Sequence, residues 1–227
     1  AVATDFINRF REDVALMKQA GLTHYRTSIN WSRFLTDYEN VTVDEEYAAY
    51  YDALFDEMHR QGIEPMICLE HYELPGVLLE TYGGWGSKHV VELFVRYAEK
   101  VFERYHAKVT RWFTFNEPIV VQTRVYLDAL RWPYEQNTGK WMQWNHHKVL
   151  ATAKVVKHFH DKGYRGTVGC ILNPEVTYPR SQAPHDVRAA EIYDLFYNRV
   201  FLDPLVHVCY PQELFTLLDQ HGVAWEY

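Results

Sequence analysis

The stretch VTRWFTFNE, from Val109 to Glu117, is rich in β-branched and aromatic residues and predicts a β-strand. Pro118 follows directly. Because a proline disfavours helical angles in the residue before it and has no N–H to donate, we expect extended backbone at Glu117 and the end of the strand there. A carboxylate at the carboxyl end of a strand, beside large aromatic side chains, is suited to general acid catalysis. The alternative is an ordinary strand-terminal acid that faces water.

The rest of the chain alternates strand-like and helix-like segments. Three further strands are predicted, at Leu22–Trp31, Ile63–His71 and Gly166–Asn173. Segments with helical period are predicted at Phe6–Ala20, Asp44–Gln61, Lys88–Tyr105, Trp144–Lys162, His185–Val200 and Gln212–Gln220. This order predicts an α/β fold with a parallel sheet, in which the loops after the strands hold the chemistry.

Composition limits the classes of protein that the chain can belong to. Its 227 residues suffice for one large domain, and we treat 1–227 as a single domain. With 48% hydrophobic residues and no apolar run near the roughly 20 residues that span a bilayer, neither a disordered nor a membrane protein is expected. The net charge of −7 argues against nucleic-acid or anionic-lipid partners. Three scattered cysteines favour a reducing, cytoplasmic location.

Polar side chains stand at the ends of the other strands too. His71 closes the second strand, Asn173 closes the fourth, and Arg26 lies within the first. Asn116 and Glu117 are neighbours on the third strand, and neighbours on a regular strand point to opposite faces. Both can reach one pocket only if the backbone is irregular, so we predict a bulge or twist within residues 115–118.

Other candidate sites are weaker. His146, His147, His158 and His160 have spacings on a predicted helix that do not converge on one metal, and no glycine-rich phosphate turn follows any strand. We therefore expect no metal and no cofactor, although His147 is a candidate to face the pocket. Four tryptophans surround the loop after Glu117, and packing of this loop and stacking on a ligand remain equal alternatives for them; they are Trp112, Trp132, Trp141 and Trp144.

The motif TFNEP, from Thr114 to Pro118, resembles the acid/base motif of family 1 glycoside hydrolases, the β-glucosidase and 6-phospho-β-glucosidase family. Further segments match this family in the family's own order. They are Tyr25–Arg33 (YRTSINWSR), Gly62–Pro65 with His71–Pro75 (HYELP) and Tyr82–Trp85 (YGGW), and Phe201–Pro204 with Tyr210–Pro211. The order of four matches argues against coincidence.

The resemblance implies a (β/α)8 TIM barrel, of which this chain carries about four βα units, strands two to five. It also implies hydrolysis of β-glucosides or 6-phospho-β-glucosides, small carbohydrate substrates, by a retaining mechanism with two carboxylates. In that scheme Glu117 is the acid/base, Asn116 binds the sugar 2-hydroxyl, and His71 binds another hydroxyl. Arg26 keeps the nucleophile ionised, and Asn173 lines the pocket.

The resemblance covers only the amino-terminal half of the family's enzymes. The nucleophile motif Thr-Glu-Asn-Gly does not occur in the sequence, so we expect the nucleophile beyond Tyr227 and no hydrolysis by this chain alone. Glu70 and Glu73 are the local alternatives for the nucleophile. A half barrel has two exposed sheet edges, which a second copy or a complementing chain would pair. The alternative is a catalytically inactive fragment that binds sugar or assembles with a partner.

Phosphorylated and plain glucosides remain open as substrates. His71, Tyr72 and Glu73 carry Tyr and Glu where plain β-glucosidases of the family usually show Trp and Asp. This difference favours the phosphorylated class.

Overall fold

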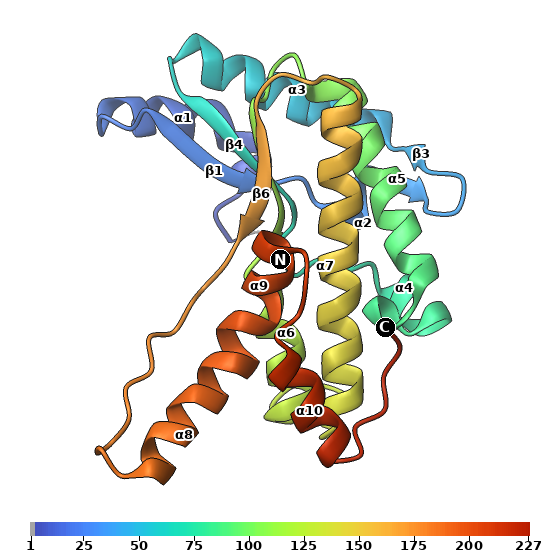
Figure 1. Ribbon diagram of the computed structural model, residues 1–227. Coiled ribbons are helices and arrows are strands. Elements are labelled where there is room, and N and C mark those ends of the chain that lie inside the picture. Colours follow the sequence, from blue (N-terminus) through green and yellow to red (C-terminus); the bar gives the residue numbers. More distant parts are fainter. Residues whose placement is uncertain (1–2) are drawn as a thin grey trace.

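The computed structural model describes residues 3–227, and its centre is a parallel sheet of four strands in the order β1-β4-β5-β6 (Figure 1). The strands are β1 (His24–Ser28), β4 (Glu64–Glu70), β5 (Arg111–Asn116) and β6 (Thr167–Ile171). Each strand pairs with its neighbour in the parallel direction, so the carboxyl ends of all four strands lie at the same edge of the sheet. This is the arrangement of half a TIM barrel.

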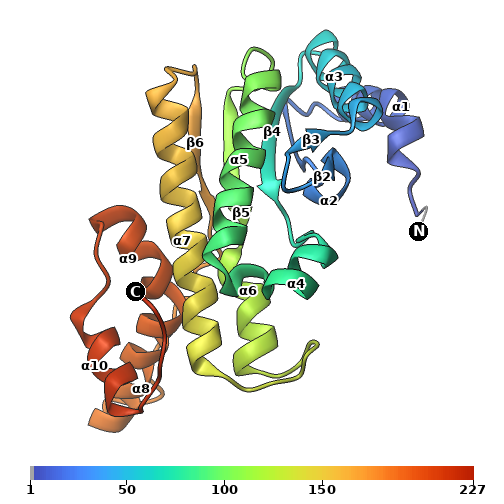
Figure 2. The same ribbon diagram turned by 90° about the vertical axis from the view of Figure 1, so that its right-hand side faces the viewer.

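Helices connect successive strands. The main ones are α1 (Phe6–Gln19), α3 (Glu45–Arg60), α5 (Lys88–Tyr105) and α7 (Thr138–Asp161). Because strand–helix–strand crossovers are right-handed, successive crossovers in one direction place their helices on the same face of the sheet. The two views show α5 and α7 side by side along β5 and β6, with α3 next to β4 (Figure 2).

Side-chain caps fix where these helices begin. The side chain of Asp44 accepts from the N–H of Tyr47 at the start of α3, and Ser87 does the same for His89 at the start of α5. Asn137 accepts from the N–H of Lys140 over 3.0 Å. This last cap starts α7 at Thr138, so the prediction that the helix begins at Trp144 is wrong by six residues.

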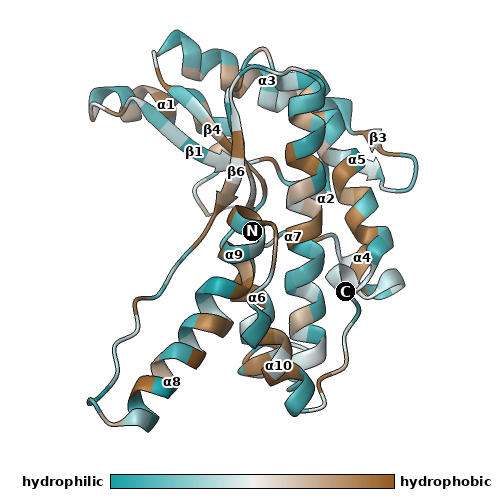
Figure 3. Cartoon of the chain, viewed as in Figure 1, coloured by the Kyte–Doolittle hydropathy of each residue, from teal (hydrophilic) through white to brown (hydrophobic). Residues whose placement is uncertain are grey.

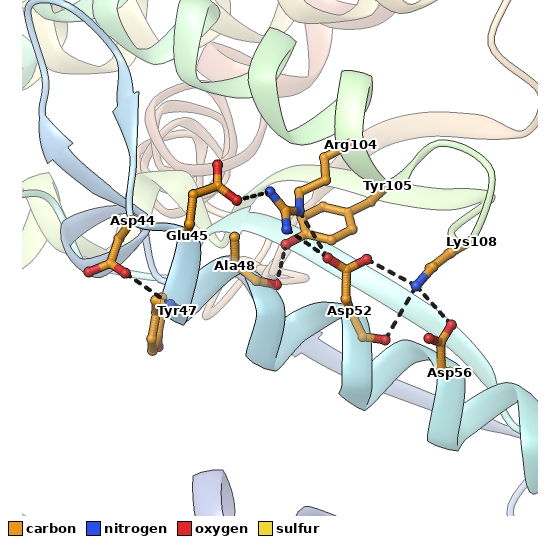
Figure 4. A network of polar contacts seen from close by, with 9 residues as sticks. All are labelled: Asp44, Glu45, Tyr47, Ala48, Asp52, Asp56, Arg104, Tyr105 and Lys108. Carbon is orange, nitrogen blue, oxygen red and sulfur yellow. Dashed lines mark hydrogen bonds and ion pairs between the residues drawn. The ribbon is translucent and has the colours of Figure 1, made fainter.

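Charged side chains join α3 to α5 on the outside of the sheet (Figure 4). Arg104 contacts Glu45 and Asp52, and Lys108 contacts Asp52 and Asp56, at 2.6–2.9 Å. Exposed ion pairs are each worth little, but a shared network has a lower entropic cost for each contact. The network connects α3 to the end of α5 and to Lys108, which follows it.

Aromatic side chains fill the layer between the sheet and the helices. Trp31 stacks on Tyr97, and Phe94 stacks on Phe115 of β5, with ring centroids 5.4 and 4.8 Å apart. Trp85 meets Phe115 edge to face. All five are at most 1% exposed, so these aromatic side chains are part of the core.

The segments after the strands contain more regular structure than the sequence predicts. The first strand ends at Ser28, and the short helix α2 (Trp31–Phe34) and the hairpin of β2 (Leu35–Asp37) and β3 (Thr42–Val43) follow it. The second loop holds α4 (Gly76–Tyr82) and η1 (Gly84–Gly86). The third loop holds α6 (Pro118–Gln122) and the short π-helix η2 (Thr123–Leu127).

The last part of the chain packs beside the lower half of α7 (Figures 1 and 2). The helix predicted at His185–Val200 is confirmed: residues 184–207 are helical without a break, and a π-helical segment lies in the middle. The observed elements are α8 (Pro184–Asp194), η3 (Leu195–Arg199), α9 (Val200–His207) and α10 (Gln212–Gln220). Most of these helices carry both hydrophobic and hydrophilic residues (Figure 3). None of the helices in residues 3–227 has the length and hydrophobicity needed to cross a membrane.

Candidate active site

Glu117 lies at the carboxyl end of β5, where the strand stops and α6 begins. Its backbone is left-handed, with φ 43° and ψ 59°, so the extended conformation expected before Pro118 is wrong. The N–H of Glu117 still donates to the carbonyl of Ile171 on β6 over 2.8 Å. The register of β5 against β6 also shifts between Phe113 and Asn116. The predicted irregularity is confirmed, and it releases Asn116 and Glu117 from strict alternation.

Three hydrogen bonds join side chains from three strands at this edge. Arg26 Nη1 of β1 donates to Asn116 Oδ1 over 2.7 Å. Asn116 Nδ2 donates to the hydroxyl of Tyr72 over 3.2 Å, and this hydroxyl donates to Glu117 Oε2 over 2.6 Å. The structure thus brings together Arg26, Asn116 and Glu117 as the sequence predicts, with Tyr72 between them.

Tyr72 is the residue that the sequence analysis did not assign to the site. It follows β4, has φ 72°, and is half-buried. Burial, and then the hydrogen bond to the Glu117 carboxylate, raise the pKa of the Tyr72 phenol. Tyr72 stands in the HYELP segment, but nothing in its spacing shows that its hydroxyl reaches a carboxylate on the next strand.

His71 is half-buried, and its ring meets the Tyr72 ring edge to face at 5.1 Å. Its backbone N–H donates to Glu73 Oε2 over 2.5 Å, and Ser28 donates to Glu73 Oε1 over 2.9 Å. Glu73 therefore ties the loop after β4 to the end of β1. His71 lies beside the network of Arg26, Asn116 and Glu117.

Asn173 lies two residues beyond β6 and contacts a different part of the chain. Its Nδ2 donates to the hydroxyl of Tyr197 in η3 over 2.8 Å. Its Oδ1 is buried and has no hydrogen-bond partner among the described residues. The structure does not connect Asn173 to the other four predicted residues by a hydrogen bond.

Glu70 and Lys148 are two further ionisable side chains, and both are buried between the sheet and α7. Glu70 ends β4 and is 2% exposed, and Lys148 of α7 is 1% exposed. Lys148 Nζ donates to the carbonyl of Pro118 over 3.2 Å, so it supports the residue that follows Glu117. Burial raises the pKa of Glu70 to about 7, although the positive charge of Lys148 opposes this shift.

Two other expectations concern side chains that are absent from this network. His147 is buried, and its ring contacts the carbonyl of Trp85 and the side chain of Gln143, so it packs against η1. Trp112, Trp141 and Trp144 are buried, whereas Trp132 is 65% exposed; Trp132 and Trp144 line the same cavity. No group of His, Cys, Asp and Glu in residues 3–227 has the arrangement of a metal site.

Comparison with known proteins agrees with the fold and the motifs. The 6-phospho-beta-glucosidase GmuD of Bacillus subtilis is 35% identical over all of this chain, and that of Dickeya chrysanthemi is 36% identical over 98% of it. Among solved structures, the beta-glucosidase BglU of Micrococcus antarcticus superimposes on 97% of the chain with a TM-score of 0.88 at 34% identity. The chain spans 48% of each of those two relatives and 46% of the BglU structure. The family model for glycosyl hydrolase family 1 matches residues 1–226, and the chain therefore belongs to this family.

Proposed function

We propose that this chain carries the acid/base part of a retaining β-glycosidase for β-glucosides or 6-phospho-β-glucosides. Glu117 protonates the glycosidic oxygen as its bond to the sugar breaks, and later removes a proton from the attacking water. The observation that carries the proposal is the half-buried Glu117 carboxyl, which Tyr72 and Asn116 connect to Arg26 across the ends of three strands.

The hydrogen bond from Tyr72 suits a proton donor that must also act as a base. It occupies Glu117 Oε2 and holds the carboxyl plane in one orientation. Oε1 remains for the proton that moves between the acid and the sugar oxygen. A carboxyl group that is already oriented in this way lowers the entropic part of the activation barrier for proton transfer.

The other predicted residues have binding roles in this proposal. Asn116 binds the sugar 2-hydroxyl, a contact that strengthens as positive charge develops on the ring. His71 binds a further hydroxyl of the same sugar. Arg26 lies beside the nucleophile and favours its ionised form, and Asn173 lines the same pocket.

The nucleophile in this proposal comes from outside these 227 residues. A retaining enzyme needs its second carboxylate roughly 5 Å from the first. Glu73 is occupied by Ser28 and the His71 N–H, and Glu70 is buried in the helix layer with Lys148. Neither local acid is therefore suited to attack a sugar, and the chain alone is expected to be inactive.

The edges of the sheet also support the proposal that further strands complete the barrel. β1 and β6 are the two outer strands, and each has one side without a strand neighbour among the described residues. Unpaired edges of a parallel sheet favour addition of further strands. We propose that strands of the remaining barrel pair there, whether they belong to a continuation of this chain or to a complementing chain. A fragment that only assembles or binds sugar would share these edges.

A chimera tests the acid/base role. This chain is fused to the part of Bacillus subtilis GmuD that follows the matched segment, and release from nitrophenyl and methyl β-glucosides and their 6-phosphates is measured. Loss of a general acid costs roughly 10²–10⁴-fold in rate. We expect Glu117→Gln to slow hydrolysis of the methyl glycosides far more than that of the nitrophenyl glycosides, because nitrophenol needs little protonation to leave.

The matched control is Glu64→Gln, which changes an exposed carboxylate at the opposite end of the neighbouring strand β4. It should leave both rates unchanged. Equal loss of rate in the two variants, or turnover by the unfused chain that Glu117→Gln abolishes, would overturn the proposal. Preference for the 6-phosphates over the plain glucosides would assign the phosphorylated class.

A further inference from the structure

A buried polar network joins α7 to the start of α6, next to the proposed acid/base. Asn145 Nδ2 donates to the carbonyl of Trp141 over 3.0 Å, and Asn145 Oδ1 accepts from Gln122 Nε2 over 2.6 Å. Lys148 Nζ donates to Gln122 Oε1 over 3.5 Å and to the carbonyl of Pro118 over 3.2 Å. The three side chains of the network, Asn145, Gln122 and Lys148, are at most 1% exposed. The network therefore runs through the interior and ends on the first residue of α6.

Lys148 is the member of this network that costs most to bury. Burial disfavours its charged form and lowers its pKa. Its Nζ lies over the rings of Phe115 and Trp85, 5.4 and 5.8 Å from their centroids. Glu70 Oε2 has no hydrogen-bond partner within residues 3–227, so the ammonium hydrogen-bonds to neutral oxygen atoms instead. Because an apolar side chain of similar volume would avoid this desolvation cost, stability alone does not explain the lysine.

The contact with Pro118 bears on the backbone of Glu117. Glu117 precedes α6 with φ 43°, and its side chain does not cap the helix. A left-handed backbone is unfavourable for a residue with a side chain, and it persists where surrounding contacts determine it. Two such contacts hold the segment: the carbonyl of Ile171 accepts from the Glu117 N–H, and Lys148 binds the Pro118 carbonyl. In this conformation the Glu117 carboxyl accepts from Tyr72.

We propose that Lys148 is a positioning residue for Glu117. By holding the Pro118 carbonyl, Lys148 fixes the left-handed turn from which the Glu117 carboxyl reaches the Tyr72 hydroxyl. The two amide side chains of the network fix the lysine in turn. Lys148 acts through the backbone and transfers no proton itself. The inference rests on the proposed acid/base role of Glu117.

The first test is amide hydrogen exchange in the unfused chain, which requires no activity. NMR follows the N–H of Glu117, and the N–H of Ile67, a buried residue of β4, reports on opening of the whole sheet. The variant is Lys148→Met, which keeps a similar volume but has no N–H to donate. The matched control is Lys157→Met on the same helix, where the lysine side chain is 75% exposed.

We expect the Glu117 N–H to exchange faster in Lys148→Met than in the unchanged chain, while the Ile67 N–H exchanges as before. Local opening is more frequent where one of two restraining contacts is lost. Lys157→Met should change neither rate. Unchanged exchange at Glu117, or equal acceleration at both positions, would overturn the inference whatever the function of Glu117.

The second test uses the fusion with the GmuD segment described above. Lys148→Met should slow hydrolysis of the methyl glycosides on the order of 10²-fold, because a displaced acid protonates the leaving group poorly, with little change for the nitrophenyl glycosides. Glu70→Gln/Lys148→Met should behave in the same way. It also removes the carboxylate that the single variant leaves buried without an opposite charge, and so covers a failure of the single variant to fold. Glu70→Gln keeps the lysine and should leave both rates unchanged.

The outcomes separate this inference from the proposed function. Equal slowing of both kinds of glycoside in the Lys148 variants, or no slowing, would overturn the inference if Glu117→Gln still distinguishes the two leaving groups. A loss in Glu70→Gln as large as in the double variant would assign the effect to the two charges and would also overturn it. If Glu117→Gln does not distinguish the leaving groups, the acid/base role is wrong, and the positioning role fails with it.

Discussion

The hydroxyl of Tyr72 donates to Glu117 Oε2 over 2.6 Å, and both residues have left-handed backbones, with φ 72° and φ 43°. Left-handed angles cost a residue with a side chain roughly 1–2 kcal/mol. The two strained residues follow adjacent strands, β4 and β5, and their side chains meet above the edge of the sheet. Strain of this kind persists where the surroundings determine the backbone, and it is common at functional sites.

The first prediction concerns this hydrogen bond. A carboxylate that accepts from a phenol stabilises its neutral form, so Glu117→Gln should lower the pKa of Tyr72, while burial still keeps it above its ordinary value. The measurement is a titration of tyrosine Cζ by ¹³C NMR, with Tyr72→Phe for the assignment. Tyr193, whose pKa Glu175 raises to about 12, is the internal control and should not change.

The second prediction concerns Asn116, which is 3% exposed and bonds to both Arg26 and Tyr72. Asn116→Ala removes both bonds and leaves the half-buried Tyr72 hydroxyl with one partner fewer. The free energy of unfolding in urea should fall by about 1–3 kcal/mol. Asn40→Ala removes one side-chain hydrogen bond, from Asn40 Nδ2 to Asp37 Oδ2, at an exposed turn and should cost less than about 0.5 kcal/mol. Equal losses would show that Asn116 is not a structural link.

Much of this architecture follows from the sequence. The helix predicted at Lys88–Tyr105 has the observed bounds, because ten buried residues recur on one face and Ser87 caps its start. The strands are also predicted to within a few residues, because runs of β-branched and aromatic side chains are typical of strands that are buried under helices. The motif around Glu117 also identifies the family, which the comparisons confirm.

The local backbone at the site does not follow from the sequence. Pro118 predicts extended angles at Glu117, but Lys148 of α7 holds the Pro118 carbonyl, and Ile171 of β6 holds the Glu117 N–H. Both contacts come from residues at least 30 positions away in the chain. Tertiary contacts therefore override the local preference, and they also turn Tyr72 toward Glu117.

The third prediction compares two glycines on either side of the turn before β6. Gly166 has φ 120°, and a Cβ there would lie 2.1 Å from the carbonyl oxygen of Thr110. Gly163 has φ 65° and nothing within 4 Å of its added Cβ. We expect Gly163→Ala to cost about 1 kcal/mol from backbone strain alone. Gly166→Ala should cost at least about 2 kcal/mol more, since backbone must move, and thermal unfolding will show the difference.

The last prediction concerns the contribution of Glu70 to the pH dependence of stability near neutrality. Its pKa is about 7 in the folded chain and roughly 4.3 in the unfolded chain. A raised folded pKa means that the folded state keeps a proton that the unfolded state releases. Its contribution to stability is therefore complete below about pH 4 and is lost as the pH rises through 7. The expected loss is on the order of 3 kcal/mol.

Glu70→Gln should remove this loss, so unfolding in urea is compared between pH 5 and pH 8 for the two chains. His146, whose pKa burial lowers to about 4, changes stability in the opposite direction over the same range, and the comparison cancels its effect. Glu70→Leu/Lys148→Met is the control for the unpaired lysine, and it should show the same reduced dependence as Glu70→Gln. If all three chains lose stability equally from pH 5 to pH 8, Glu70 is already ionised in the fold, and burial does not hold its proton.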